Sequence, residues 1–412
     1  MPSPNSMERA RTEDLQARAE KVLPGGNTHV ARAYTPAVYV TRAQGSRKWL
    51  VDGRELIDYT MGHGALLLGH AHPAIVQAVR DQVARGTHYG ASHPLEIEWA
   101  ELISGLVPSA EQVRFTQSGT EAAMLGLRVA RAATGREVVV KLHEHFHGWS
   151  DTVSVDLDAT GRPEASPGVP KVVASVTRVV PPDIESIRAA LAARDAAALI
   201  LEPSGAHYGG IPLEDGLALA LRAACDETGT LLVFDEVVTG FRVAPGGMQA
   251  TLRVRPDLTL FGKVMGGGLP GGAVGGRRDL MALLAGRIMH AGTFNANPLT
   301  ASAGIATLRI VGDGAPQRAA DGYARTLEAE WRAVLEAVGI PGKVWRLSSI
   351  VHVKLDDPHL QGRLSNAMRD QGVDLLRTSA FCSAVHSLRD LDETAAAFRR
   401  AAVTLLQPAR AV

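Results

Sequence analysis

Short apolar runs alternate along the chain with alanine-rich stretches that favour helix. The apolar runs, rich in Val, Leu and Ile, cover residues 138–142, 197–203 and 230–237, and the alanine-rich stretches cover 185–197 and 217–228. Strands buried on both faces read as continuous apolar runs, and their alternation with helices is typical of β-α-β connections. The pattern therefore predicts an α/β fold built on a mainly parallel central sheet.

The two ends of the chain show a different pattern. Residues 35–59 read as strands around an Asp-Gly turn. After Pro298 a long helical stretch leads to VWRLSSIVHVKL at 344–355 and to a final helix at 392–406. We therefore expect a smaller α+β domain made from both ends of the chain. The predicted division is 1–60 and 299–412 for this smaller domain and 61–298 for the large one.

Two further segments have their own predictions. Residues 7–23 are polar and predict a helix that ends at Pro24. Residues 152–170 contain DATGRPEASPG, which predicts a mobile loop over the cleft between the two domains.

Composition and charge restrict the partners. The chain has 412 residues, of which 46% are hydrophobic, and its 43 Lys and Arg balance 43 Asp and Glu. Without net charge we expect small-molecule partners rather than nucleic acid or an anionic membrane. Cys225 and Cys382 are the only cysteines, which predicts no disulfide framework and a cytoplasmic location. No signal-like or long apolar stretch occurs, so we expect the chain to be neither exported nor embedded.

Two charged residues stand at the ends of apolar runs. Asp235 closes TLLVF, and Lys263 follows LTLF and opens GKVMGGGLPGGAVGG. At the edge of a sheet an amine could form a Schiff base and a carboxylate could keep a pyridine nitrogen protonated, so the pair points to pyridoxal phosphate. The stretch Ser118-Gly119-Thr120 adds a phosphate site at a helix N-terminus, although by itself such a stretch is more often an ordinary cap.

Several segments carry a family resemblance. They are PGGNTHVARAY, LLLGHAHPAI, FTQSGTEAAM, HFHGWSD, SPGVP, LLVFDEVVTGFRVAPGG, FGKVMGGGLPGGAVGG and GTFNANPL. DEVVTGF and the glycine run after Lys263 are the specific ones. With these segments, most of the chain resembles the class III aminotransferases, which are fold type I pyridoxal phosphate enzymes, and within them the glutamate-1-semialdehyde aminomutase-like branch.

The resemblance implies a role for each matching residue. Lys263 would bind the cofactor and move the proton at the reacting carbon, while Asp235 would keep the pyridine nitrogen protonated. Val237 and Phe146 would pack on the two ring faces, although the wider family often has tyrosine at the second position. The other implied cofactor contacts are Ser118, Gly119, Thr120, His147, Glu202 and Thr293. Thr293 would reach the phosphate of the neighbouring subunit, in a homodimer with shared active sites.

Two of these segments have another interpretation. His143, His145 and His147 alternate, so on a strand they would share one face, as zinc ligands do. The resemblance places them at the cofactor ring instead, and we expect no metal. The glycine run after Lys263 loosely resembles a dinucleotide loop, but Pro270 interrupts it, and we expect its glycines to allow a tight turn.

The substrate side carries weaker signals. Arg32 aligns with the arginine that holds the substrate carboxylate in the aminomutase branch, and guanidinium matches carboxylate with two hydrogen bonds. His63, a second predicted substrate contact, stands where that branch has tryptophan, and His207 stands at an asparagine position. The loop after HGWSD also differs, and segment 376–388 lacks the glutamate of that branch.

These departures lead us to expect an aminotransferase that moves an amino group between a carboxylate-bearing amino compound and a keto or aldehyde acceptor. A glutamate-1-semialdehyde-type aminomutase is the alternative, and a racemase or epimerase on the same fold would use the same lysine. A cofactor-free scaffold is the non-enzymatic alternative, which colourless purified protein would support.

Overall fold

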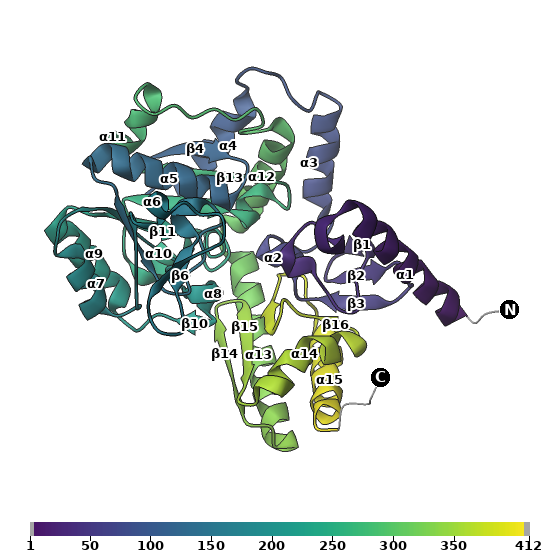
Figure 1. The fold of residues 1–412 in the computed structure, drawn as a ribbon. Helices are drawn as coiled ribbons and strands as arrows, with labels where there is room; N and C mark the ends of the chain where they lie inside the picture. The colour runs from purple at the N-terminus through teal and green to yellow at the C-terminus, as the bar shows by residue number, and fades with distance from the viewer. Residues whose placement is uncertain (1–3, 408–412) are drawn as a thin grey trace. The chain divides into compact units, whose positions relative to one another are not determined.

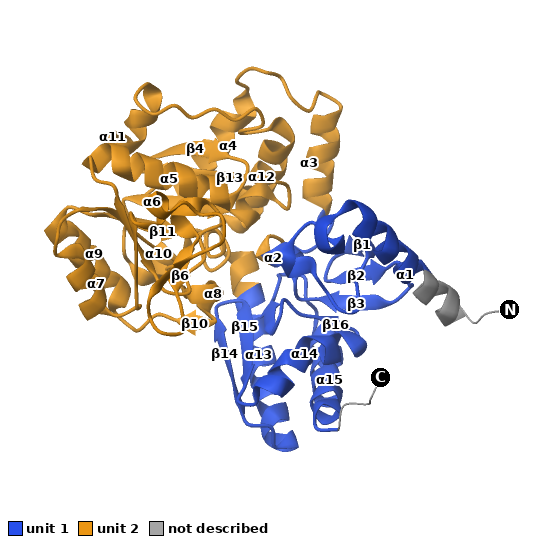
Figure 2. Cartoon of the chain, viewed as in Figure 1, with its two compact units in different colours: residues 1–63, 68–72, 320–412 blue, residues 64–67, 73–319 orange. Residues whose placement is uncertain are grey.

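The structure is a computed structural model that describes residues 4–407 (Figure 1). The chain forms two compact units (Figure 2). The first comprises residues 1–63, 68–72 and 320–412, and the second comprises 64–67 and 73–319. The second unit therefore extends past the boundary that we placed at residue 298.

The second unit is built on a sheet that, within the described residues, has seven strands. Strand β13 is antiparallel to both of its neighbours, β12 and β4, while β12, β11, β9, β5 and β8 pair in parallel. The predicted mainly parallel sheet is thus confirmed. In sheet order the strands are β4 (Gln112–Thr116), β13 (Gly272–Gly276), β12 (Leu258–Gly262), β11 (Leu231–Asp235), β9 (Ala196–Leu201), β5 (Val138–Leu142) and β8 (Thr177–Val180).

Helices cover both faces of this sheet (Figure 1). Side chains of β9 alternate between the faces, because successive residues of a strand point to opposite sides. Ala198 and Ile200 pack in one buried cluster with helix α5 (Gly119–Thr134). Leu199 and Leu201 pack in another with α7 (Ile184–Leu191) and α9 (Leu217–Thr228). The continuous apolar runs of the sequence therefore reflect burial on both faces.

The second unit also contains helices α3 (Pro73–Val83), α4 (Pro94–Leu106) and α12 (Pro298–Val311), and α12 packs against the other two. Trp99 of α4 is fully buried and stacks on Phe115 of β4, with ring centroids 4.2 Å apart. Its indole Nε1 donates a hydrogen bond to the carbonyl of Met265 at 3.1 Å. Trp99 thus fixes the turn that begins with Lys263.

The end of the glycine run differs from its prediction. Residues 272–276 form the buried strand β13 rather than a tight turn. A Cβ at Gly272 would collide with the carbonyl of Ser118, and one at Gly275 would lie 2.5 Å from Ala110. The glycines are therefore required because other backbone approaches closely, which their sequence pattern alone does not reveal.

Segment 152–170, predicted as a mobile loop, is also more ordered than expected. Strands β6 (Val155–Leu157) and β7 (Pro163–Ala165) pair as an antiparallel ribbon. Asp156 of β6 accepts a hydrogen bond from Lys141 at 2.9 Å and lies 2.7 Å from Nδ1 of His143. The bond to Lys141 ties the ribbon to strand β5, so the segment contains a pair of strands that the sequence analysis did not predict.

The first unit contains two small sheets and four long helices among the described residues. One sheet has the order β1 (Val40–Gln44), β2 (Arg47–Leu50), β3 (Glu55–Asp58), β16 (Val373–Asp374), and the other has the order β14 (Gly342–Leu347), β15 (Ile350–Leu355), β17 (Ser379–Phe381). The helices are α1 (Pro4–Val22), α14 (Pro358–Asp370), α15 (Leu388–Leu405) and most of α13 (Ala315–Val338), whose first five residues belong to the second unit.

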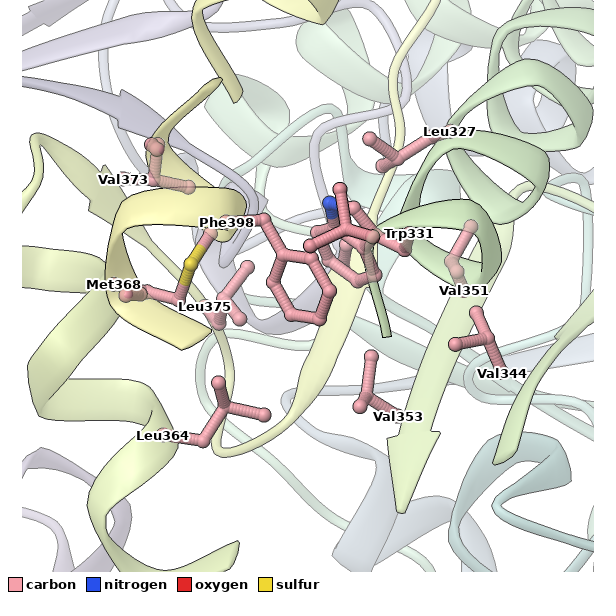
Figure 3. Close-up of a cluster of buried hydrophobic side chains, with 14 of the residues drawn as sticks. Leu327, Trp331, Val344, Val351, Val353, Leu364, Met368, Val373, Leu375 and Phe398 are labelled. Atoms are coloured by element: carbon pink, nitrogen blue, oxygen red, sulfur yellow. The ribbon is translucent and has the colours of Figure 1, made fainter. Parts of the chain in front are cut away.

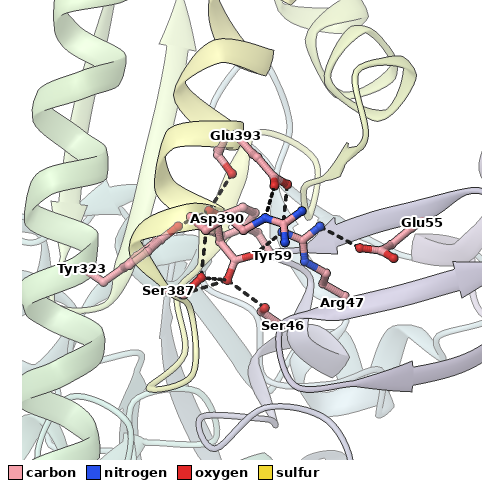
Figure 4. Close-up of polar contacts among 10 residues, drawn as sticks. Ser46, Arg47, Glu55, Tyr59, Tyr323, Ser387, Asp390 and Glu393 are labelled. Carbon is pink, nitrogen blue, oxygen red and sulfur yellow. Dashed lines mark hydrogen bonds and ion pairs between the residues drawn. The ribbon is translucent and has the colours of Figure 1, made fainter.

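The core of the first unit is apolar and aromatic (Figure 3). Trp331 of α13 stacks on Phe398 of α15 with ring centroids 4.9 Å apart. A polar cluster joins β2 to the start of α15 (Figure 4). There Arg47 binds Glu55 at 2.7 Å, Asp390 at 2.7 Å and Glu393 at 2.8 Å. The two chain ends are therefore held together as one folded unit.

Short elements complete the chain. They are η1 (Pro24–Gly26), η2 (Val30–Arg32), α2 (Met61–Gly64), η3 (Asp151–Val153), α6 (Lys171–Ala174), α8 (Ala206–Gly209), β10 (Ile211–Pro212), α10 (Gly247–Leu252), η4 (Lys263–Gly266), α11 (Arg278–Met281) and η5 (Ala282–Ala285). Among residues 4–407, no helix combines the length and apolar character needed to cross a membrane.

Candidate active site

The predicted cofactor residues of the second unit gather where parallel strands end. Asp235 is the last residue of β11, Glu202 follows β9, and Lys263 follows β12. Helix α5 begins just after β4, and the segment that contains His147 follows β5. In open α/β sheets the carboxyl ends of the strands are where ligands bind. The sheet therefore assembles one site from separate parts of the chain.

Asp235 is held from two sides. Its Oδ2 lies 2.8 Å from Nδ1 of His147, and its Oδ1 accepts a hydrogen bond from the backbone amide of Val237 at 3.0 Å. Both side chains of the Asp-His pair are buried. Nε2 of His147 is buried and makes no hydrogen bond within the described residues. The carboxylate is thus fixed in orientation.

Lys263 is half-buried and has a left-handed backbone conformation, with φ of 50°. Burial lowers the pKa of its amine to about 8, although the nearby carboxylates of Asp235 and Glu202 act in the opposite direction and Arg242 adds to the lowering. A lysine with a lowered pKa has more of its amine neutral near neutral pH. It is therefore better suited to nucleophilic and proton-transfer chemistry.

Glu202 connects two loops of the site. Its carboxylate accepts hydrogen bonds from the backbone amides of Phe146 at 3.0 Å, His207 at 3.2 Å and Tyr208 at 2.9 Å. His207 and Tyr208 both have left-handed φ of 53°, a costly conformation for these residue types. Burial raises the pKa of Glu202 to about 7, and the charge of Asp235 contributes to the increase. The buried carboxylate thus stabilises the strained 206–209 turn.

The predicted phosphate turn is closely packed. Ser118 is the N-cap of α5, where its hydroxyl accepts a hydrogen bond from the amide of Glu121 at 3.2 Å. A Cβ at Gly119 would lie 2.8 Å from Val237, and one at Gly148 would collide with Thr120. A helix N-terminus presents amides that can bind an anion. The two glycines let neighbouring segments approach this end of α5.

The two predicted ring-face residues differ in exposure. Val237 is half-buried between Gly119 and Gly262, where added Cβ atoms would meet its methyl groups. Phe146 is 65% exposed in the single chain, while its backbone amide is fixed by Glu202. Neither residue contributes a polar atom to the site through its side chain.

Thr293 lies in a loop that other segments of the second unit hold. Its carbonyl accepts a hydrogen bond from Nε2 of His88 at 2.5 Å. The side chain of Gln117, which lies next to the predicted phosphate turn, donates a hydrogen bond to the carbonyl of Phe294. The loop that contains Thr293 is thereby attached to the segment just before α5.

Arg32 and His63 belong to the first unit, so their contact with the residues above remains a prediction. Arg32 is exposed, and its Nη1 donates a hydrogen bond to the hydroxyl of Thr28 at 3.3 Å. His63 has a left-handed φ of 56°, and its ring centroid lies 5.4 Å from that of His29. Polar and cationic groups therefore gather in this part of the first unit.

The three alternating histidines do not share one strand face. Strand β5 ends at Leu142, and Glu144 has a left-handed φ of 64°, so the alternation breaks. His145 accepts a hydrogen bond from the amide of Glu202 at 2.9 Å, and burial lowers its pKa to about 2. Within the described residues no group of three His, Cys, Asp or Glu side chains could hold a metal ion.

Glu236 has a structural role that the sequence analysis missed. It is fully buried and accepts hydrogen bonds from the amides of Met248 at 2.6 Å and Gln249 at 2.9 Å and from the hydroxyl of Thr239 at 2.7 Å. Glu236 thereby anchors the segment after Asp235. Its position after a buried apolar run was the signal, because a charged side chain there must find partners.

Comparisons with known proteins identify the family. The class-III aminotransferase profile matches residues 29–398, so the chain belongs to the class-III aminotransferases. A glutamate-1-semialdehyde 2,1-aminomutase of Chloroflexus aurantiacus is 42% identical over 94% of this chain and 95% of its own. The family, its fold type and the aminomutase-like resemblance that we predicted are confirmed.

Solved structures agree on the fold. An omega-transaminase from Sphaerobacter thermophilus has a TM-score of 0.91 and 33% identity, over 96% of this chain and 97% of its own. A glutamate-1-semialdehyde aminomutase from Pseudomonas aeruginosa PAO1 has a TM-score of 0.90 and 25% identity, over 98% and 96%. The family depends on pyridoxal phosphate, and one solved transaminase of this fold has it bound.

The site residues fit that cofactor. An amine with a lowered pKa is available at Lys263, and a fixed carboxylate is available at Asp235. The start of α5 offers a helix N-terminus for a phosphate, next to a glycine whose Cβ would meet Val237. This combination of an amine, a carboxylate and an anion site is what pyridoxal phosphate requires of a protein.

Proposed function

We propose that the protein moves an amino group within a small carboxylate-bearing substrate, as a glutamate-1-semialdehyde 2,1-aminomutase does. The 42% identity to the Chloroflexus enzyme over nearly the whole chain carries this proposal. From the sequence alone we had placed transamination first, because several substrate-side residues depart from the aminomutase pattern. The identity to the named relative reverses that order.

Within this function, Lys263 is proposed to hold the cofactor and to transfer the proton at the reacting carbon. Its amine, with a pKa lowered to about 8, suits both tasks. Asp235 is proposed to keep the pyridine nitrogen protonated, and His147 to hold Asp235 in place. When bound, pyridoxal phosphate supplies the electron sink for the reaction.

The surrounding residues are proposed to orient the cofactor. Ser118, Gly119 and Thr120 bind the phosphate through the start of α5, and Val237 and Phe146 pack on the ring faces. Glu202 acts through the hydrogen bonds that its carboxylate accepts from backbone amides, one of which is the amide of Phe146. Thr293 serves the neighbouring subunit of a homodimer, in line with the resemblance that led us to name it.

Arg32 is proposed to bind the substrate carboxylate. Its guanidinium is exposed and, among the described residues, has one weak hydrogen-bond partner, Thr28, so its remaining donors suit a two-pronged contact with a carboxylate. His63 is proposed to contact the same substrate, and its left-handed backbone is the kind of strain that functional sites retain.

Transamination with an external partner is the second candidate. The solved omega-transaminase shares 33% identity with this chain, whereas the solved Pseudomonas aminomutase shares 25%. The substitutions at His63 and His207 and the missing glutamate in 376–388 fall on residues that an aminomutase would use to retain its intermediate.

One experiment separates the two candidates. Purified enzyme is supplied with glutamate 1-semialdehyde, with and without pyruvate and other keto acids, and 5-aminolevulinate and new amino acids are quantified. The aminomutase proposal expects 5-aminolevulinate without any added keto acid, at a rate well above that of amino acid formation. Efficient transfer to a keto acid with little 5-aminolevulinate contradicts it and supports transamination. Lys263→Ala protein serves as the inactive control.

A further inference from the structure

Two histidines in the second unit bind the Thr293 loop in the same way. Nε2 of His88 lies 2.5 Å from the carbonyl of Thr293, and Nε2 of His93 lies 2.8 Å from the carbonyl of Ala296. Residues 84–93 connect α3 to α4, and residues 292–297 precede α12. Two loops far apart in sequence are therefore joined at two points.

The other ring nitrogen fixes the tautomer of each histidine. Nδ1 of His88 accepts a hydrogen bond from the amide of Gly90 at 3.2 Å, and Nδ1 of His93 accepts one from the amide of Glu96 at 3.3 Å. A nitrogen that accepts from an N–H group carries no proton, so Nε2 carries it and donates to the loop carbonyl. Each neutral imidazole is thus a rigid two-ended link.

The link is anchored to helices. His93 is the N-cap of α4 in a reciprocal capping box with Glu96. Its ring packs edge-on against Tyr89 with centroids 5.7 Å apart, and the hydroxyl of Tyr89 accepts a hydrogen bond from Gln82 of α3 at 2.7 Å. His93 therefore couples the position of the Ala296 carbonyl to the positions of α3 and α4.

A third contact acts from the opposite loop. Asn297 caps α12, because its side-chain oxygen accepts a hydrogen bond from the amide of Leu299 at 2.9 Å. Its Nδ2 donates a hydrogen bond to the carbonyl of Thr87 at 2.8 Å. Ala296 has a left-handed φ of 52°, which costs free energy and needs support from its surroundings. The backbone at Thr293 and in the residues that follow it is thus fixed by side chains.

We propose that His88 and His93 are positioning residues that fix the Thr293 loop for its contact with the cofactor phosphate of a second subunit. The proposal rests on the proposed function, in which Thr293 makes that contact. Neither histidine touches the cofactor, and each acts through a carbonyl of the loop. Their removal should weaken binding of a phosphorylated cofactor while leaving the rest of the fold intact.

The test measures binding of pyridoxamine 5′-phosphate to cofactor-free full-length protein by calorimetry, because this compound binds without forming a Schiff base. Pyridoxamine without phosphate is the matched ligand. His93→Asn keeps a capping side chain for α4 but is too short to reach Ala296, and His88→Ala removes the contact with Thr293. His359→Ala, on an exposed part of the first unit, is the control variant.

We expect His88→Ala and His93→Asn to bind the phosphorylated ligand roughly tenfold more weakly, because the loss of a hydrogen bond worth about 1.4 kcal/mol changes the affinity by that factor. The affinity for pyridoxamine should not change. His88→Gln, which restores a donor, should recover most of the loss. The double variant His88→Ala/Thr293→Ala should bind the phosphorylated ligand only slightly more weakly than Thr293→Ala alone. Thermal midpoints of the cofactor-free variants should stay near that of the parent protein.

Two failures are distinguishable. If Thr293→Ala weakens binding but the histidine variants do not, the positioning role is wrong and the proposed function stands. If Thr293→Ala binds the phosphorylated ligand normally, the phosphate contact assigned to Thr293 is wrong and the positioning role fails with it.

Discussion

Nδ1 of His147 lies 2.8 Å from Oδ2 of Asp235, and both side chains are buried at the carboxyl edge of the sheet. The backbone amide of Val237 holds the other carboxylate oxygen. A carboxylate with both oxygens fixed can face a ring nitrogen without rearrangement, which is the preorganisation that catalysis favours.

This pair gives the first prediction. Asp235→Asn should slow proton removal from the substrate by orders of magnitude while some cofactor stays bound, because a neutral side chain no longer favours the protonated ring. His147→Ala should lower kcat by roughly ten- to a hundredfold, since it removes one hydrogen bond to a charged group. Stopped-flow spectra of single turnovers measure both effects. Near-native turnover in Asp235→Asn would show that this carboxylate does not act on the ring.

The second prediction concerns Lys263. Borohydride reduction should fix pyridoxal phosphate to Lys263, and peptide mass mapping locates the modified residue. Because burial lowers the amine pKa to about 8, the neutral and reactive form becomes more abundant as pH rises towards 8, so cofactor-free protein should recombine with pyridoxal phosphate faster at pH 8 than at pH 6.5. Lys354→Ala, on an exposed strand position, is the control that should behave as the parent. An adduct on another lysine contradicts the assignment.

Glu202 gives a prediction about stability and pH. Burial raises its pKa from 4.5 to about 7, so the folded chain binds more protons than the unfolded chain between these values. Stability from this group is therefore present below pH 4.5 and is lost as pH rises to 7, by about 3 kcal/mol across the window. Glu202→Gln removes the titration, so its stability relative to the parent should increase as pH rises from 5 to 8. Urea unfolding at both pH values measures the difference, and a constant difference would refute the raised pKa.

That the proposed cofactor residues lie at one edge of the sheet could be predicted from sequence, because they follow strand ends. Asp235 and Lys263 terminate apolar runs, and parallel strands bring their carboxyl ends to one edge. No pattern of this kind revealed the ribbon at 152–170. Asp156 connects it to Lys141 of strand β5 and to His143, which directly follows that strand.

Other features depended on contacts between distant segments. The histidine alternation at 143–147 suggested a strand face, but a left-handed residue, Glu144, ends that pattern. His88 and His93 bind backbone carbonyls in a loop about two hundred positions away, and backbone partners leave no trace in residue type. The substrate could not be predicted either. Its proposed contacts, Arg32 and His63, lie in the first unit, and no strand-end pattern like that of Asp235 and Lys263 marks them.

Gly119 tests the phosphate turn. Gly119→Ala should weaken binding of pyridoxal phosphate by roughly tenfold or more, because the new Cβ would lie 2.8 Å from Val237 and must push apart the start of α5 and the segment after Asp235. Gly105→Ala in α4 is the matched control, since a Cβ there meets no atom within 4 Å and should leave stability unchanged or slightly raised. Cofactor titration and thermal unfolding are measured for both variants. Equal affinity in the two variants would show that the turn does not contact the cofactor.

The last prediction tests whether the active site is shared between subunits. Lys263→Ala and Thr293→Ala proteins should each have little activity alone. In a mixed dimer, one site would combine the intact Lys263 of one chain with the intact Thr293 of the other, so dissociating and mixing the two inactive proteins should restore part of the activity. If Thr293 instead served the cofactor of its own chain, every site in the mixed dimer would carry one of the two substitutions and mixing would restore nothing. Light scattering on the parent protein supplies the independent check, since a fully active monomer is incompatible with a shared site.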